Sequence, residues 1–375
     1  MNKNTKSQGS FITFRSLILA LFLIGINSYW LIQAELVRYS GHPTCISLFF
    51  NVVCIISVLV LVNAIFKQVY SKLALRQEEL LAIYCMLCVS SFIAGHDLMQ
   101  VLIPQLSHAF WFATPENEWE VFHKYMPSWL TVSDKTALEG LYESKSKIYI
   151  PTYIEYMKKW APVILTWSAF LTVIVFVMYC INVILRKQWM DNEKLSYPVA
   201  RLPMELISDG GNLSFFRKKT VLIGLGIAVF LNLLNGFAFL YPSIPSIPIK
   251  QRNIGYLFAS EPWNAVGWFP ISFYPFVIGL GFLIPVDLSF SCWFFYLFYK
   301  GTLVLGRATG LARGAIQLHP NEQMLGAYLG VLVIAAWRYK HYLTDVLITA
   351  FRQNKKMDEN EPMSYRSALI GTVVG

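Results

Sequence analysis

The feature that most limits the fold of this chain is a series of apolar runs, each about twenty residues long and almost free of charge. In helical form, a run of about this length crosses the roughly 30 Å hydrocarbon core of a bilayer. The chain is 55% hydrophobic and only 14% charged over its 375 residues, whereas a soluble domain carries about 25% charged residues. The sequence therefore predicts an all-α polytopic integral membrane protein.

About six full transmembrane helices are expected, together with one broken pair of half-helices. The predicted spans cover residues 14–34, 46–65, 79–103, 162–185, 221–240 and 324–337. Aromatic residues typical of membrane interfaces lie at their ends, among them Trp30, Trp160 and Trp337. The resulting organisation is three helices in 1–103, an extracytoplasmic loop or cap in 104–159, further helices in 160–337, and a cytoplasmic segment in 338–375.

Basic residues in the short connections set the predicted orientation, because such clusters stay on the cytoplasmic side. They predict a multi-pass protein of the cell's inner (plasma) membrane with its amino terminus in the cytoplasm. The clusters are Lys3, Lys6 and Arg15; Lys67, Lys72 and Arg76; Arg186, Lys187, Lys194, Arg201, Arg217, Lys218 and Lys219; and, after Trp337, Arg338, Lys340, Arg352, Lys355, Lys356 and Arg366. The last cluster is cytoplasmic only if residues 269–299 leave and return on one side. Lys300, Arg307 and Arg313 then fall outside, which counts against this orientation.

Residues 269–299 form a long apolar run that is interrupted once, around Pro285. Proline removes a backbone donor and disfavours helix at the residue before it, so the flanks should be two half-helices, 275–284 and 288–299. At the helical rise these are about 15 and 18 Å long, each about half of the hydrocarbon core. The pattern predicts a re-entrant helical hairpin with its tip near mid-membrane, the kind of broken helix with which secondary transporters build a site.

Asp287 is the acid of this broken run, and an ionisable residue deep in a bilayer is a functional hypothesis by default. Its carboxylate is a candidate contact for a coupling ion or polar solute, with Ser289, Gly281 and Pro285 beside it. The alternative is that Asp287 caps the second half-helix by accepting from its first free amides. The two roles are compatible, because helix termini also bind ions.

His96, Asp97 and Gln100 form a second polar group near the outer end of the third predicted span. His96 and Gln100 are one helical turn apart, a spacing that suits a proton relay. The alternative is an interfacial cluster that caps the helix before Pro104. We include all three residues among the candidate contacts of the ion or solute.

Neither a metal site nor a cofactor is predicted. Cys85 and Cys88 resemble a CxxC pair on the same helix side as His96, but a fourth ligand is missing. The chain contains no P-loop, dinucleotide fingerprint, HExxH or GxSxG. Its formal charge of +9 does not indicate nucleic acid, because the basic residues lie in short clusters between the apolar runs.

The expected partners are those of a membrane protein. They are the lipid bilayer and a small polar solute or ion. The apolar run that opens at 368 stops after eight residues, which predicts a missing carboxy-terminal half of the same chain. A second copy of the chain, in a homo-oligomer, is a further candidate.

Four segments of the chain resemble a bacterial membrane-protein family of unknown function. They are EELLAIYCMLCVSSFIAGHDLMQ at 78–100, NEKLSYPVARLPMEL at 192–206, GLGFLIPVDLSFSCWFF at 279–295 and EPMSYRSALIG at 361–371. That family in turn resembles the oligopeptide transporters, which carry peptides or metal chelates and have a similar EKLSYP segment and broken helices. The resemblance implies a proton-coupled protein with about twice as many spans, and with Asp287 near the solute path.

The sequence thus predicts the amino-terminal half of a secondary transporter, coupled to protons or another ion, for peptides or similar small polar solutes. One alternative is an integral-membrane enzyme with an interfacial site at His96 and Asp97. Its further candidate residues are Glu116, Glu118 and His123. The other alternative is a non-transporting membrane scaffold, in which Asp287 only caps a helix.

Overall fold

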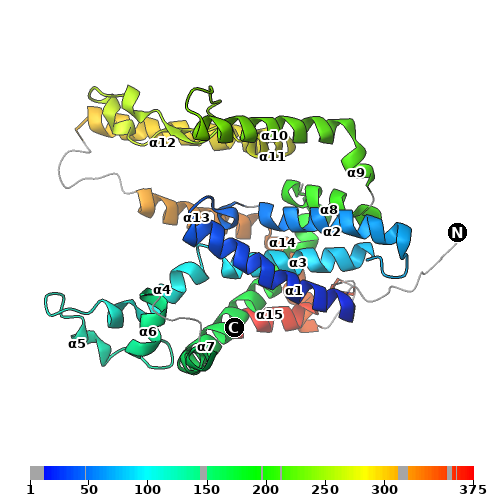
Figure 1. Cartoon of the computed structure of the whole chain (residues 1–375), viewed down its shortest axis with the longest axis horizontal. Helices are drawn as coiled ribbons and strands as arrows, with labels where there is room; N and C mark the ends of the chain where they lie inside the picture. Colours follow the sequence, from blue (N-terminus) through cyan, green and yellow to red (C-terminus); the bar gives the residue numbers. More distant parts are fainter. Residues whose placement is uncertain are drawn as a thin grey trace. The chain divides into compact units, whose positions relative to one another are not determined.

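A computed structural model describes residues 12–46, 48–143, 150–195, 197–211, 213–310, 320–352, 357–359 and 361–375. Helix dominates this part of the chain, and its two short strands, β1 (Arg252–Asn253) and β2 (Pro270–Ile271), pair antiparallel. Six of the described helices are long and apolar enough to cross a membrane (Figure 1). The predicted all-α polytopic membrane protein is confirmed.

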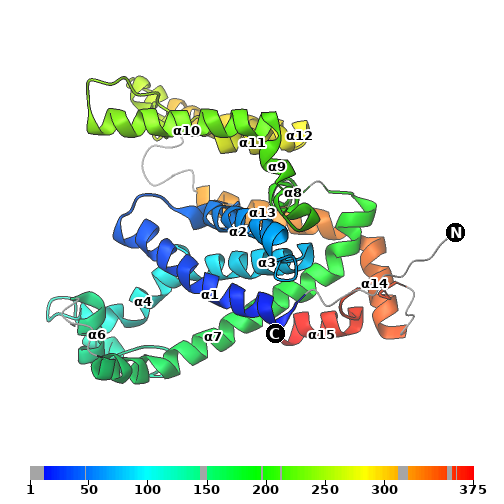
Figure 2. The ribbon, with the colours of Figure 1, turned by 45° about the vertical axis from the view of Figure 1, so that its right-hand side comes forward.

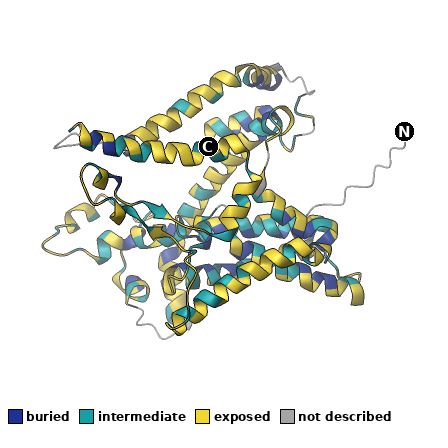
Figure 3. Ribbon diagram, turned by 90° about the horizontal axis from the view of Figure 1, so that it is seen from above, coloured by how far each residue is buried: buried dark blue, intermediate teal, exposed yellow. Residues whose placement is uncertain are grey.

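The candidate spans largely agree with the predicted ones. They are Phe14–Val37, Phe50–Val69, Gln77–Trp111, Pro151–Asn192, Lys219–Leu240 and Val286–Ala308. The predicted span at 324–337 corresponds to a shorter apolar helix, Gln323–Arg338. Exposed residues run along most helices (Figure 3), as surfaces that face lipid require. Several of the basic residues that set the predicted orientation lie outside the described residues, namely Lys3, Lys6, Arg313, Lys355 and Lys356.

The chain divides into two compact units, residues 1–55, 82–195 and 338–375 in the first and 56–81 and 196–337 in the second. The helices wholly in the first unit are α1 (Phe14–Leu31), α4 (Met99–Trp111), α5 (Glu120–His123), α6 (Lys135–Tyr142), α7 (Ile150–Lys187), α14 (Lys340–Arg352) and α15 (Tyr365–Val374). Helices α2 (Phe50–Val69) and α3 (Gln77–Ala94) contribute residues to both units. Those wholly in the second are α8 (Pro198–Gly211), α9 (Ser214–Arg217), α10 (Lys219–Leu240), α11 (Pro275–Leu283) and α12 (Val286–Ala308). The last helix, α13 (Pro320–Arg338), belongs almost entirely to the second unit.

In the first unit, α7 packs along α15 and forms one hydrophobic core with it and α14 (Figures 1 and 2). Gly371 allows this approach, because a Cβ added there would lie 2.6 Å from the sulfur of Cys180. The core carries its own polar contact: the hydroxyl of Tyr342 donates to the carbonyl of Ile184 over 2.7 Å. The segment after α14 is therefore held against α7 by both apolar packing and a buried hydrogen bond.

The segment predicted as the loop 104–159 is largely helical. Helix α4 continues through Pro104, α5 and α6 come next, and α7 already begins at Ile150. The hydroxyl of Tyr142 on α6 donates to the carbonyl of Pro104 over 2.8 Å, which joins α6 to α4. A small core lies among these helices, formed by Leu106, Val132, Ala137, Leu138, Trp160 and Val163. The described part of this segment is thus an ordered helical unit, called the cap below, and its extracytoplasmic placement stays a prediction.

Asp134 begins α6, and its loss should weaken this cap in a pH-dependent way. Its carboxylate accepts from the side chain of Thr136 and the amide of Ala137, and it lies 3.2 Å from Nζ of Lys159; these contacts lower the pKa of Asp134 to about 2. We expect D134A to remove about 1 kcal/mol of stability at pH 7. Because the folded pKa lies below the unfolded value of about 3.9, this contribution is complete above that value and fades as the pH falls toward 2.

Thermal unfolding in detergent, followed by circular dichroism, tests this expectation. The difference in melting temperature between wild type and D134A should be clear at pH 7 and smaller at pH 3. E139A, which removes an exposed acid from the same helix, is the control and should have little effect at either pH. A D134A difference of the same size at both pH values would contradict the pKa argument.

In the second unit, α11 and α12 are the two helices of the broken run. The helix is interrupted at Ile284 and Pro285, whose ψ angles of 152° and 144° are extended, as predicted. Helix α12 has 23 residues and continues to Ala308, whereas the sequence predicted an end at Tyr299. It ends where Gly310 adopts a φ of +77°, the left-handed conformation with which glycine commonly terminates helices.

The two ends of the broken run lie side by side. Nζ of Lys300 donates to the carbonyls of Val266 and Trp268 over 2.9 and 2.6 Å, and the ring of Phe269 lies 5.7 Å from that of Tyr296. The chain therefore leaves along α11 and returns along α12, as a hairpin requires.

The tip of this hairpin lies against α8 and α9. Leu283, at the end of α11, lines a pocket of about 560 Å³ together with Arg201 of α8 and Phe215 of α9. Because α9 directly precedes α10, the tip is level with the beginning of α10 and not half way along it. Helix α12 is nearly twice as long as the half-helix expected from the sequence, whereas the position of the tip near mid-membrane stays a prediction.

Candidate functional site

Glu35 is the centre of a polar interior site among the described residues of the first unit. Helix α1 passes into a π-helical segment, Ile32–Val37, and the wider turn there directs Glu35 inward, where it is fully buried. Its carboxylate accepts hydrogen bonds from N and Oγ1 of Thr44, over 2.8 and 2.7 Å, and from Nε2 of Gln100 over 2.8 Å. Among the described residues, neither a lysine nor an arginine pairs with it. π-helical turns are frequent at functional sites.

His96 and Asp97 lie in a turn between α3 and α4. The predicted span 79–103 was expected to be one helix, but α3 ends at Ala94 and α4 begins at Met99. The break brings the chain against Thr44: a Cβ on Gly95 would lie 2.6 Å from Oγ1 of Thr44, and the amide of His96 donates to that oxygen over 3.1 Å. Thr44 therefore connects the turn to Glu35.

Next to Thr44 lie two imidazole rings, a thiol and a carboxylate. The rings of His42 and His96 meet edge to face at 4.9 Å. Nδ1 of His96 lies 3.2 Å from Oδ1 of Asp97, and Sγ of Cys45 lies 3.9 Å from Oδ2 of the same acid. Nδ1 of His42 and Oε1 of Gln100 are buried and have no hydrogen-bond partner among the described residues. Buried polar atoms are nearly always paired, so these two require an explanation.

A second buried polar group lies deeper along α1. Nδ2 of Asn27 donates to Oγ of Ser91 over 2.8 Å, and Nδ2 of Asn51 reaches Oδ1 of Asn27 and Oγ of Ser91 over 2.7 and 3.0 Å. Asn27 and Glu35 are eight residues apart, about 12 Å along the helix axis. Oδ1 of Asn51 is a third buried atom without a partner among the described residues. Polar groups thus extend inward from Glu35 toward the middle of the first span.

Asp287 is exposed in the first turn of α12, two residues beyond the N-cap position. Pro285 occupies the N-cap position, and no side chain caps this helix, so the expected cap by Asp287 is wrong. The amide of Ser289 bonds to the carbonyl of Pro285 within the helix, and a Cβ added to Gly281 would meet nothing within 4 Å. A contact between Asp287 and an ion or solute stays a prediction.

The residues proposed for a membrane enzyme have local partners in the cap. Nε2 of His123 lies 2.8 Å from the carbonyl oxygen of Ala109, and its ring packs on Phe110. A hydrogen bond with Thr114 lowers the pKa of Glu116. In the described part of the chain, the group of possible ligand side chains around His96 and Asp97 contains Cys45 and none of Glu116, Glu118 and His123.

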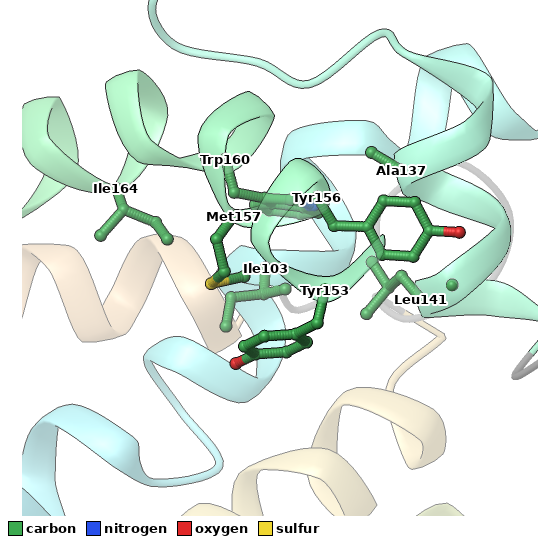
Figure 4. A pocket seen from close by; sticks show the side chains of 9 residues that line it. Ile103, Ala137, Leu141, Tyr153, Tyr156, Met157, Trp160 and Ile164 are labelled. Carbon is green, nitrogen blue, oxygen red and sulfur yellow. The ribbon is translucent and has the colours of Figure 1, made fainter. Parts of the chain in front are cut away.

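A separate pocket of about 320 Å³ opens beside the cap (Figure 4). Tyr153, Met157 and Trp160 of α7 line it, together with Ile103 of α4 and Leu141 of α6. Its lining contains no charged side chain. This pocket suits an apolar group, such as an acyl chain, better than a polar solute.

Sequence reasoning identified His96, Asp97 and Gln100 but missed Glu35, His42, Thr44 and Cys45. The available signal was Glu35 itself, the acid at the end of an apolar run that has no other charged residue after Arg15. The short connection after it, 38–49, contains the other three residues. An acid at the end of a run is ordinary at a membrane interface, so this signal was weak.

The family relationship agrees with part of the sequence analysis. A model of a protein family described as a family of unknown function (DUF6785) matches residues 6–375. Among curated proteins and solved structures, none matches the chain. Nothing in these comparisons links it to the oligopeptide transporters. Because the match covers nearly the whole sequence, the chain belongs to the family of unknown function DUF6785.

Proposed function

We propose that this protein is a proton-coupled secondary transporter of peptides or similar small polar solutes, in the plasma membrane with its amino terminus in the cytoplasm. The observation that supports the proposal is Glu35, a fully buried carboxylate in a candidate span with three hydrogen-bond donors and, among the described residues, no ion pair. Ionisable residues inside membrane spans are costly, and they commonly mark proton or ion paths.

The contacts of Glu35 allow it to bind and release a proton through rotation of one neighbouring side chain. The ionised carboxylate accepts from Nε2 of Gln100, whose own Oε1 has no partner among the described residues. When the carboxylate is protonated, rotation of the Gln100 amide presents Oε1 as the acceptor of the new O–H, at the cost of the hydrogen bond that Nε2 donates to the carbonyl of Ala94 over 3.1 Å. One side chain can therefore satisfy both protonation states, because an amide offers a donor on one side and an acceptor on the other.

The deeper polar group supports a path from Glu35 into the membrane. Asn27, Asn51 and Ser91 are buried, and Oδ1 of Asn51 is an acceptor left unpaired among the described residues. An unpaired acceptor in an apolar interior is unfavourable, so a water molecule or a solute group is expected to bind there.

The hairpin of the second unit supports the proposal separately. Broken helices line the substrate site in many secondary transporters, and Asp287 is exposed beside the break as a candidate solute contact. Lys300 and Arg307 counted against the predicted orientation, but each has a local partner. Lys300 binds the carbonyls of Val266 and Trp268, and NH2 of Arg307 lies 2.7 Å from Oε1 of Glu261. Their charges are thus partly compensated within the unit.

Electrical recordings from proteoliposomes on a solid-supported membrane test the proposal, with jumps in the concentration of alanyl-alanine and a panel of other small peptides. Wild type should give a peptide-dependent current that increases when an inward proton gradient is imposed. E35Q should lose the response to the gradient, and D287N should require a higher peptide concentration. E78Q, which neutralises an exposed acid, is the control and should behave as wild type.

Two results would overturn parts of the proposal. If no peptide gives a current above that of protein-free liposomes, the assignment as a peptide transporter is wrong. If E35Q responds to the proton gradient as E78Q does, Glu35 is not the coupling residue. Gel filtration and circular dichroism of each variant separate these results from misfolding.

A further inference from the structure

Three side chains of different ligand types converge at the outer edge of the Glu35 site. A sulfur of Cys45, a ring nitrogen of His96 and a carboxylate oxygen of Asp97 all lie within 4.8 Å of one another. The two closest pairs are separated by 3.2 Å, between His96 and Asp97, and by 3.9 Å, between Cys45 and Asp97. The ligands of a tetrahedral zinc ion, at bond lengths of about 2.0–2.3 Å, lie roughly 3.3–3.8 Å apart. The His96–Asp97 and Cys45–Asp97 distances, each to a different oxygen of Asp97, are therefore close to the spacing of zinc ligands.

The ring of His42 lies next to that of His96, although His42 is outside the group of three whose ligand atoms lie within 4.8 Å of one another. Its ring lies edge to face with that of His96 at 4.9 Å, and Tyr39 packs against its other side at 4.6 Å. Nδ1 of His42 is buried without a hydrogen-bond partner among the described residues. A buried histidine nitrogen without a hydrogen-bond partner needs another partner, and a bound metal ion would supply one.

We propose that Cys45, His96 and Asp97 bind one divalent transition-metal ion of the zinc class, and that the adjacent His42 side chain rotates to supply the fourth ligand. The donor set is one thiolate, two imidazoles and one carboxylate, which together suit zinc better than calcium or magnesium, because these hard ions prefer oxygen ligands. Cys45 and Asp97 are exposed, so the ion can reach the site from solvent. The proposal concerns a separate site and does not depend on the proposed transport function.

The surrounding hydrogen bonds hold the two ligand-bearing segments together. His42 and Cys45 belong to the connection between the first two spans, and His96 and Asp97 belong to the turn after α3. Thr44 joins the two, since its Oγ1 accepts from the amide of His96 and donates to Glu35. Such outer contacts orient metal ligands and are typical of protein metal sites.

Metal binding at this site should release a proton. Zinc-class ions bind cysteine as the thiolate, whereas a free cysteine carries its proton for the most part at neutral pH. The S–H bond must therefore lose its proton to solvent when the thiolate binds the ion. The apparent affinity is expected to rise with pH for this reason.

Titration of the reduced full-length protein in detergent with Co²⁺ tests the site. Wild type should bind one equivalent with a thiolate-to-cobalt charge-transfer band, and Zn²⁺ should displace it. C45S should abolish the band, H96Q and H42Q should each weaken binding at least tenfold, and the control C292S should leave it unchanged, because Cys292 is an exposed thiol of the second unit.

The opposite results would overturn the proposal. Absence of the band in wild type, or its survival in C45S, excludes a metal site at Cys45. Unchanged affinity in H42Q removes His42 from the ligand set. Neither result bears on the peptide currents, so failure of the metal proposal and failure of the transport proposal are distinguishable.

Discussion

R186M is expected to lower the free energy of unfolding by about 3 kcal/mol. Nε and NH2 of Arg186 donate to the two carboxylate oxygens of Glu361 over 2.7 and 2.9 Å, and this pair joins α7 to the segment before α15. The Glu361 side chain is only 2% exposed. Without Arg186, its carboxylate would remain buried and unpaired, and removing one partner of a buried pair is strongly destabilising.

The reciprocal change should be milder, and this asymmetry makes the prediction specific. The Arg186 side chain is 42% exposed, so in E361M water can solvate the guanidinium group, and a loss of about 1 kcal/mol is expected. The double variant R186M/E361M leaves no unpaired charge and should be more stable than R186M alone. Chemical unfolding in one detergent, followed by tryptophan fluorescence, gives the four values needed. Equal losses in the two single variants would show that the burial of Glu361 does not determine the effect.

The hairpin shows which parts of the fold could be predicted from the sequence. The helix break at Pro285 results from the covalent structure of proline, so one residue was sufficient to place it. The length of α12 depends on the contacts of the residues after Tyr299, where Lys300 suggested the end of the helix. Its ammonium group instead reaches back to the carbonyls of Val266 and Trp268, contacts that a single sequence cannot show.

The candidate site was predictable only where its residues are neighbours in the sequence. His96, Asp97 and Gln100 fall within one segment and were recognised as a polar group. The partner of Gln100 is Glu35, 65 residues away, and the burial of Glu35 results from packing between separate segments. Cys45 and Asp97 are likewise 52 residues apart. Hydrophobicity along the chain identifies spans, but it does not report which distant polar residues meet.

Comparison of E35L with E35Q is expected to separate the structural role of Glu35 from its role in proton coupling. Leucine has the volume of the side chain but no acceptor, so N and Oγ1 of Thr44 and Nε2 of Gln100 would lose their partner. Leaving buried donors unpaired costs about 1–3 kcal/mol each, less where water can enter. The connection that contains Thr44 should therefore detach from the turn at His96, and both the peptide current and the Co²⁺ band should be lost.

Glutamine should behave differently, because its carbonyl oxygen can still accept from Thr44, and its amide can donate to Oε1 of Gln100 once the Gln100 amide has rotated away from the carbonyl of Ala94. E35Q is thus expected to keep the Co²⁺ band while losing the response of the current to the proton gradient. This combination, a retained Co²⁺ band and a lost response to the proton gradient, is expected if Glu35 must bind a proton during transport. If E35Q loses both the Co²⁺ band and the response to the proton gradient, Glu35 acts by holding the connection 38–49 in place, and its negative charge is needed for structure. If E35L keeps both, the hydrogen bonds of Glu35 support neither activity, and the coupling residue must lie elsewhere in the chain.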